Sequence, residues 1–574
     1  MLSTYKKKPA IGLNGFAIEG WNAIISLLGK RSIGRCVMAI DCYTGIDHEE
    51  LQNQFLKLES DLFIHTKDLF ISESEVEVLT ARFMTDDVLF GYNSNISLSE
   101  YFDLDKLKAA QKSVGEASGS VIIFGHGAQL VAVADTLIYA DMPRWEIQQR
   151  MRRQEATALG IDNSREPFSF QYKRGLFNDW RVLDKHKRAI YHNVDYWLDT
   201  VAHDSPKLID RQTFYAGMDK AAASPFRVVP FFDPAPWGGQ WMKDEFALDA
   251  SKVNYGWGFD CVPEENSLLL DVNNIVFEMP SVNLVYTKSS ELLGKPVEAR
   301  FGMDFPIRFD FLDTVNGGNL SLQVHPTTQY ARDNFGLHYT QDESYYIMEA
   351  KENAHVYIGL KTGVDRHVMM DELDKAEQGD LVFDADKYVN KIPTKKHDHF
   401  LIPAGTIHCS GMNAVVLEIS STPNLFTFKL WDWQRLGLDG KPRPINVQRG
   451  KQVLNWDCDT TYTNAQLVNN VEVVAQGHGW VEEKTGLHNS EFIETRRHTF
   501  SSPVIHYTQE SVNVLNLVDG EEIIVESPTD AFEPMIIHYA ETFIIPAAVE
   551  AYCIRPHGLS EGKECITIKA SVRI

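Results

Sequence analysis

The spacing of hydrophobic and polar residues changes along the chain. In the first 200 or so residues, apolar runs of strand length at 35–41, 120–124 and 136–141 are separated by amphipathic stretches such as 49–58. Pro143 opens a further helical stretch, as expected for a residue that favours the first turn. Buried strands that alternate with helices indicate a parallel α/β sheet.

The pattern becomes one of short strands after residues 221–239, a segment rich in Ala, Pro and Gly that predicts a linker. A helical insert at 365–378 interrupts these strands, and short strands return over 490–574. This arrangement is typical of a β-sandwich or barrel. The strands predicted before and after the insert are 305–312, 320–324, 345–349, 355–360, 399–402 and 414–420.

A faint internal repeat is present in the β-rich part. Residues 400–408 read FLIPAGTIH and residues 543–551 read FIIPAAVEA, both apolar strands that end in Pro-Ala. A duplicated barrel would explain the repeat. We therefore expect an α/β domain over 1–222, a first barrel with a helical insert over 223–455 and a second barrel over 456–574.

Composition narrows the function classes. The chain has 574 residues, with 55 Lys and Arg against 79 Asp and Glu, so its net charge is −24. A strongly acidic chain disfavours binding to nucleic acid or to an anionic membrane, whereas a small anionic substrate can still bind in a local positive pocket. The seven cysteines form no CxxC pair, and lysines near the N-terminus precede no apolar signal core. We expect a cytoplasmic protein with no membrane span.

One group of side chains has the chemistry of a metal site. Gln323 and His325 are two residues apart, so on a strand they point to the same face. Glu343 begins the next predicted strand, and His408 follows a Pro-Ala-Gly-Thr turn. A barrel can bring these groups together, and imidazole, carboxylate and amide oxygen suit Zn²⁺ or another first-row divalent ion.

Several motifs occur in a fixed order: QVHP, DESYYI, IPAGTIHCSG, LEIS and WDW at 431–433. Together with FFDPAPWGGQW and KPRPINV, they resemble the class I mannose-6-phosphate isomerases, which are zinc-dependent cupin enzymes. The resemblance covers about residues 225–574. It implies that Gln323, His325, Glu343 and His408 bind one Zn²⁺. The second cupin has Ala551 in place of His408, which implies no metal site there.

The resemblance also implies a reaction. An enzyme of this kind interconverts mannose 6-phosphate and fructose 6-phosphate through an enediol, with the metal as Lewis acid. Glu418, Lys429 and Asp432 match motif positions for catalysis, and Ser321 matches a serine that binds phosphate. The expected partner is a small sugar phosphate, and the oligomeric state is left open.

Three residues depart from the family pattern. Gln341 stands where the family has lysine, Asn424 where it has aspartate and Lys429 where it has arginine. All lie in the catalytic or substrate-binding periphery rather than in the metal set. The same reaction with compensating groups, isomerisation of another sugar or sugar phosphate, and a sugar-binding regulator without turnover therefore stay open.

The N-terminal part resembles a uridine-kinase-like P-loop domain. The evidence is the segment 120–153, with its strand and basic helix, and the residues DCYTG at 41–45, which fit the second strand of that fold. The phosphate-binding sequence G-x-x-x-x-G-K-[ST] is absent from the sequence. We therefore expect a kinase-like relic without tight nucleotide binding, in which Arg144, Arg150, Arg152 and Arg153 form a solvated helix face.

Overall fold

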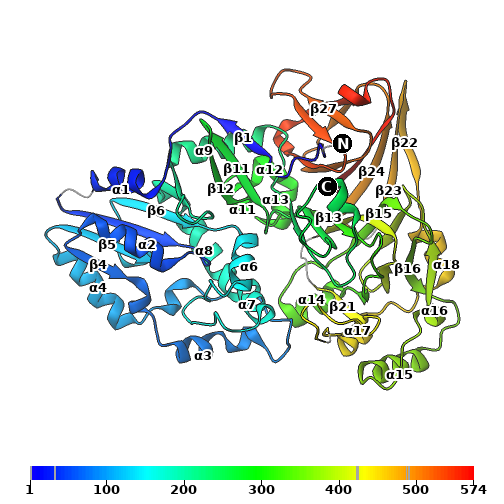
Figure 1. The fold of residues 1–574 in the computed structure, drawn as a ribbon, viewed down its shortest axis with the longest axis horizontal. Coiled ribbons are helices and arrows are strands. Elements are labelled where there is room, and N and C mark those ends of the chain that lie inside the picture. Colours follow the sequence, from blue (N-terminus) through cyan, green and yellow to red (C-terminus); the bar gives the residue numbers. More distant parts are fainter. Residues whose placement is uncertain (1–2, 32–33, 422–425, 442, 487, 489–490) are drawn as a thin grey trace.

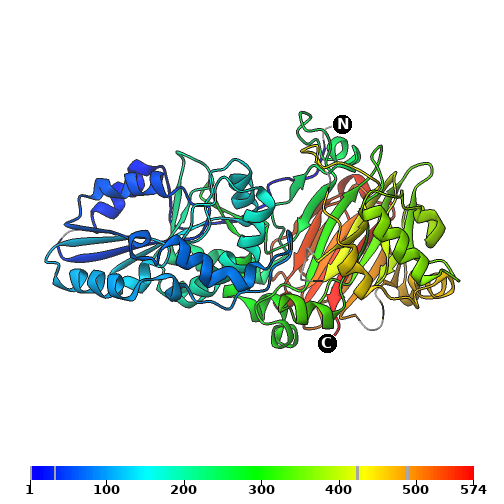
Figure 2. The same ribbon diagram turned by 90° about the horizontal axis from the view of Figure 1, so that it is seen from below.

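The protein has an α/β part and a β-rich part that lie side by side (Figures 1 and 2). The computed structural model describes residues 3–31, 34–421, 426–441, 443–486, 488 and 491–574. The α/β part, blue to cyan in Figure 1, comes first in the chain, and the β-rich part runs from green to red. The multidomain architecture predicted from the sequence is therefore confirmed.

The α/β part is built on a seven-stranded sheet in which five neighbouring strands are parallel. The central strands are almost fully buried because helices cover the sheet, which explains their continuous apolar sequences. In spatial order the strands are β2 (Ala17–Glu19), β8 (Lys207–Asp210), β7 (Tyr196–Asp199), β6 (Thr136–Asp141), β3 (Cys36–Cys42), β5 (Ser120–Gly125) and β4 (Leu62–His65).

The helices of this part begin close to their predicted positions. Pro143 precedes α6 as its N-cap, as its position in the sequence indicated. In the described part of the chain, no helix combines the length and apolar character needed to cross a bilayer. The principal helices are α2 (His48–Phe55), α3 (Glu73–Met84), α4 (Leu104–Glu116), α6 (Arg144–Arg152), α7 (Phe168–Arg174), α8 (Trp180–Ile190) and α9 (Arg211–Ala223).

One local expectation about this part is wrong in part. Residues 41–45 begin in β3 and continue into the loop that follows it, and their match to the second strand of a P-loop domain stays a prediction. The arginines of α6 form a solvated face only in part. Arg152 and Arg153 are exposed, but Arg150 is 1% exposed and donates to the backbone carbonyl groups of Gly45 and Thr200. Arg144 likewise pairs with Asp184. The charge pattern of α6 did not reveal these partners, which are distant in sequence.

The first barrel consists of a six-stranded and a five-stranded antiparallel sheet. The predicted helical insert is present as α15 (Arg366–Glu377). The six-stranded sheet contains β18 (His399–Ile402), β15 (Glu343–Ala350), β20 (Ala414–Ser421), β13 (Ile307–Asp313), β10 (Trp257–Cys261) and β9 (Phe231–Asp233). The five-stranded sheet contains β17 (Val389–Pro393), β16 (His355–Leu360), β19 (His408–Ser410), β14 (Leu322–Val324) and β21 (Phe428–Trp431).

The second barrel repeats this plan. Its six-stranded sheet contains β29 (Thr542–Ile545), β26 (Asn513–Asp519), β31 (Cys565–Val572), β24 (Ile493–Phe500), β23 (Trp480–Gly486) and β22 (Glu472–Gly477). Its other sheet contains β28 (Met535–His538), β27 (Glu522–Glu526), β30 (Ala551–Pro556) and β25 (Val504–Tyr507).

Apart from β21, which has no counterpart in the second barrel, the strands of the two barrels have the same order across the sheets and along the chain. The two repeated segments start in the edge strands β18 and β29, which confirms the duplication. His408 begins β19, and Ala551 begins the corresponding strand β30.

The two parts are joined by more than a linker. β1 (Ala10–Leu13) pairs with β11 (Ser267–Val272), which pairs with β12 (Ile275–Pro280). Within the predicted linker, Phe226 bridges to Ile544 in the second barrel and Val229 bridges to Ser267. One hydrophobic cluster continues from the α/β sheet into both barrels. The linker prediction was therefore wrong in one respect, because the segment is packed into the structure.

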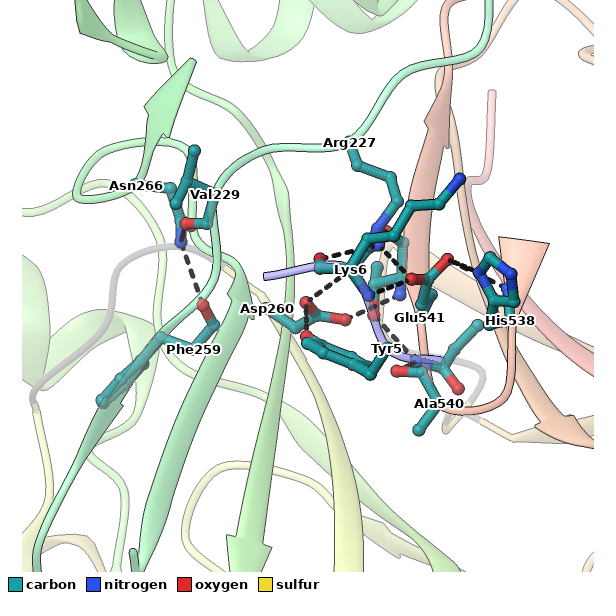
Figure 3. Close-up of polar contacts among 12 residues, drawn as sticks. Tyr5, Lys6, Arg227, Val229, Phe259, Asp260, Asn266, His538, Ala540 and Glu541 are labelled. Atoms are coloured by element: carbon teal, nitrogen blue, oxygen red, sulfur yellow. Dashed lines mark hydrogen bonds and ion pairs between the residues drawn. The ribbon is translucent and has the colours of Figure 1, made fainter. Parts of the chain in front are cut away.

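A buried ion network holds this junction together (Figure 3). The guanidinium of Arg227 lies 2.6 Å from Glu541 and 3.6 Å from Asp260, and all three side chains are at most 1% exposed. The Tyr5 hydroxyl donates to Asp260 at 2.5 Å, and the backbone N–H of Lys6 donates to Glu541 at 2.6 Å. The N-terminal segment, the first barrel and the second barrel therefore share one set of charges.

Replacing Arg227 with Met should destabilise the protein strongly. The change leaves two buried carboxylates without their cation, and breaking such a pair costs about 3–5 kcal/mol. Arg211→Met is the matched control, because Arg211 pairs with Asp195 at the surface, where a pair is worth about 0–1 kcal/mol. Thermal unfolding measures the stability of both variants. Equal unfolding temperatures for Arg227→Met and Arg211→Met would contradict this role for Arg227.

Candidate functional site

Three predicted metal ligands meet inside the first barrel. His325 follows β14, Glu343 begins β15 and His408 begins β19, so three strands contribute one side chain each. Glu343 lies 3.0 Å from His325 Nε2 and 2.8 Å from His408 Nε2. Ligand atoms of the three residues all lie within 4.8 Å of one another, and the side chains are at most 1% exposed.

The hydrogen bonds behind the histidines fit a metal site. His408 Nδ1 lies 2.8 Å from the carbonyl oxygen of Thr406, and His325 Nδ1 lies 3.3 Å from that of Phe426. A carbonyl oxygen can only accept, so each Nδ1 carries the proton and each Nε2 keeps its lone pair for a cation. Among the described residues, His325 Nε2 and one oxygen of Glu343 make no hydrogen bond. Imidazole and carboxylate form a donor set that suits Zn²⁺.

The fourth predicted ligand, Gln323, lies next to this triad. It pairs with His408 across the β14–β19 ladder, and its amide nitrogen lies 3.3 Å from His408 Nε2. Rotating the amide by 180° brings its oxygen, a group that can bind a metal, to the same position. The structure therefore brings together all four residues that the sequence predicted.

Further carboxyl groups surround the triad. Gln341 donates to Glu343 at 2.9 Å and to Glu418 at 3.4 Å. Asp310 lies opposite Glu418 in the β13–β20 ladder. Burial and the neighbouring Asp310 raise the pKa of Glu418, whereas two histidines outweigh burial and hold the pKa of Glu343 well below its usual range. Asp310 was missed by the sequence analysis because it lies in an ordinary strand sequence.

A cavity of about 390 Å³ lies beside the triad. Gln323, Gln341, Glu418 and Asp310 line it, and the first two also contact the triad. The remaining walls combine aromatic rings with charged side chains such as Arg308 and Lys173. Cavities of this size and character typically hold small molecules.

The predicted residue Lys429 also lines this cavity. Burial and the neighbouring Arg443 lower the pKa of its ammonium group to about 8. In the described part of the chain, no hydrogen bond to this ammonium group is found. Lys429 therefore places an amino group at the wall of the cavity.

Asp432 lies behind the cavity wall and holds two residues that line it. The hydroxyl of Ser321 donates to Asp432 at 2.9 Å, and Arg443 donates to Asp432 at 2.6 Å. Arg443 was not singled out from the sequence, although it belongs to the KPRPINV motif. Asn424 lies outside the described residues.

Comparisons with known proteins divide the chain in the same way. Residues 20–223 match a family described as a domain of unknown function (DUF8485). Mannose-6-phosphate isomerase of Streptococcus mutans is 27% identical over 233 residues, which are 40% of this chain and 68% of that protein. A probable mannose-6-phosphate isomerase of Bacillus subtilis is 25% identical over 254 residues, covering 44% of this chain and 75% of that protein.

Solved structures are also similar. The mannose 6-phosphate isomerase from Bacillus subtilis has a TM-score of 0.49 and 18% identity, covering 60% of this chain and 99% of that one. A phosphomannose isomerase mutant from Salmonella typhimurium has a TM-score of 0.46 and 11% identity, covering 61% and 100%. By sequence, the barrel part of the chain distantly resembles mannose-6-phosphate isomerases, and the N-terminal part is not identified.

Near the end of β3, two carboxylates accept hydrogen bonds from backbone N–H groups, which concerns the expectation that the α/β part is a kinase-like relic. The loop that follows β3 leads into α2, whose N-terminus is capped by the Asp47 carboxylate accepting from the backbone N–H of Glu50. Asp41 accepts from the N–H groups of Gly127 and Gln129. Carboxylates of the protein therefore accept hydrogen bonds from backbone N–H groups of the kind that a phosphate-binding loop offers to its ligand.

We expect the purified protein to hold about one divalent ion per chain. His408→Ala should remove it, because the variant loses one of the two imidazoles that face Glu343. His203→Ala is the control, since His203 belongs to the other cluster of potential ligands, a more exposed one with Asp47 and Glu50. Elemental analysis checks both, and loss of metal from His203→Ala alone would contradict the assignment.

Proposed function

We propose that the protein interconverts mannose 6-phosphate and fructose 6-phosphate. The observation that carries the proposal is the convergence of His325, Glu343 and His408 next to a cavity lined by a carboxyl group and a buried ammonium group. The distant relatives named above supply the reaction class. In this proposal, His325, Glu343, His408 and Gln323 hold Zn²⁺, which supplies Lewis-acid polarisation of the sugar carbonyl group.

Glu418 is the proposed proton carrier. Aldose–ketose isomerisation moves a proton between C1 and C2, so the reaction needs a side chain that can both accept and donate at these atoms. Glu418 lines the cavity and contacts Gln341, which in turn contacts the triad. It thereby combines access to a ligand with proximity to the metal-ligand set.

Lys429, Ser321 and Arg443 are proposed to bind the phosphate group. A lysine ammonium, a serine hydroxyl and an arginine all donate to phosphate oxygens, and all three line the cavity. Asp432 accepts from both Ser321 and Arg443, so we assign it the role of positioning them rather than of contacting substrate. The lysine in place of arginine keeps the charge but not the planar fork.

The zinc-loaded protein should form fructose 6-phosphate from mannose 6-phosphate in a coupled assay, and Lys429→Met should raise KM. A hydrogen bond to a charged group is worth about 1.5–3 kcal/mol, which corresponds to roughly a tenfold or greater increase. Lys441→Met is the control, because Lys441 is exposed and does not line the cavity.

Two results would contradict the proposal. A folded, zinc-loaded protein without turnover of mannose 6-phosphate would contradict the reaction. Equal KM values for the Lys429 and Lys441 variants would contradict the phosphate site while leaving the reaction intact. Turnover of unphosphorylated mannose, with the same KM in the Lys429→Met and Lys441→Met variants as in the wild type, would indicate that the substrate is a sugar without phosphate.

A further inference from the structure

The α/β part supplies a wall of the cavity next to the metal-ligand set. Trp145 and Gln148 extend from α6, and Phe168, Tyr172 and Lys173 extend from α7, all into the same cavity that Gln323 and Glu418 line from the barrel. In Figure 1, α6 and α7 lie on the side of the α/β part that faces the barrels. The residues come from the region that matches the domain of unknown function.

Aromatic rings form a continuous stack across the boundary between the two parts. Trp145 stacks on Phe231, with ring centroids 4.2 Å apart and an angle of 19°. Phe231 stacks on Phe259 at 4.7 Å, and Phe259 stacks on Trp257 at 5.5 Å. All four rings line the cavity. One wall is thus a single aromatic surface, of which the α/β part contributes the first ring.

Polar contacts fix this wall in place. The Tyr172 hydroxyl donates to Glu265 at 2.8 Å, and Gln148 donates to the other oxygen of Glu265 at 3.2 Å. Arg152 donates to both oxygens of Asp233, at 2.9 and 2.7 Å, with its guanidinium over the Trp145 ring. Arg152, Asp233 and Glu265 hold α6 and α7 against the barrel, so the wall is preformed.

Hydrophobic contacts from a second segment strengthen the junction. Phe90 of the α/β part packs against Phe335, Phe426 and Phe428, with ring centroids 5.4–5.9 Å apart. Phe90 thereby belongs to the hydrophobic core of the first barrel. The cavity therefore depends on both parts for its shape.

We propose that the α/β part is a component of the sugar site, with Trp145 and Tyr172 contacting the C–H groups of the bound sugar phosphate. An aromatic face packs against the C–H groups of a sugar, while the polar groups opposite fix its orientation. The wall then sets which sugars fit, which gives this region a role in substrate selection. This inference rests on the proposed function in that a sugar phosphate occupies the cavity.

The test is the affinity of the full-length, zinc-loaded protein for mannose 6-phosphate, measured by calorimetry. Trp145→Ala should weaken binding about tenfold, because one aromatic packing contact is lost. Trp145→Phe should retain most of the affinity, since an aromatic face remains. Phe170→Ala is the matched control, because Phe170 lies on α7 but is 44% exposed and does not line the cavity. Metal content should be equal in all four proteins.

The outcomes separate this inference from the proposed function. Equal affinities of all variants would overturn the inference, even if the protein isomerises mannose 6-phosphate. Binding that depends on Trp145 in a protein without turnover would support the inference and reject the reaction. Failure of the zinc-loaded wild type to bind mannose 6-phosphate, fructose 6-phosphate or ribose 5-phosphate would overturn both.

Discussion

A carboxylate buried between two imidazoles is the constraint on which the site depends. Glu343 is inaccessible to solvent and lies within 3.0 Å of an imidazole nitrogen of both His325 and His408. Burying an isolated charge is very costly, so this arrangement needs positive charge at its centre. A divalent cation would supply that charge, and the Nδ1 hydrogen bonds orient both rings for it. The barrel provides the geometry because its short strands bring distant segments together.

The α/β part and the barrels form one unit rather than two tethered domains. Arg227 joins three segments through buried charges, and Phe90 is part of the core of the first barrel. The aromatic stack that begins at Trp145 crosses the same boundary. Because the α/β part is fixed to the barrels in this way, it supports the shape of the cavity. It also contributes side chains to the cavity wall.

The sequence predicted the parts of this structure that local pattern determines. The strand 136–141 and the helix after Pro143 follow from periodicity and proline placement. The triad was predicted because its motifs resemble those of a known family. Arg150 and Trp145 show where prediction fails: a basic helix appears solvated, yet Arg150 is buried on backbone carbonyl groups and Trp145 stacks on Phe231. Their partners are distant in sequence and become visible only in the fold.

The most direct test of the account is proton NMR of mannose 6-phosphate in D₂O with the full-length protein. The zinc-loaded protein should produce the signals of fructose 6-phosphate, a chelator should stop the reaction, and added Zn²⁺ should restore it. Such a result requires hydrogen transfer between C1 and C2 at a site that depends on a divalent ion, and deuterium taken up from D₂O marks it as proton transfer. Mannose 6-phosphate that binds to the zinc-loaded protein, yet shows no product and no hydrogen exchange, would contradict an isomerase.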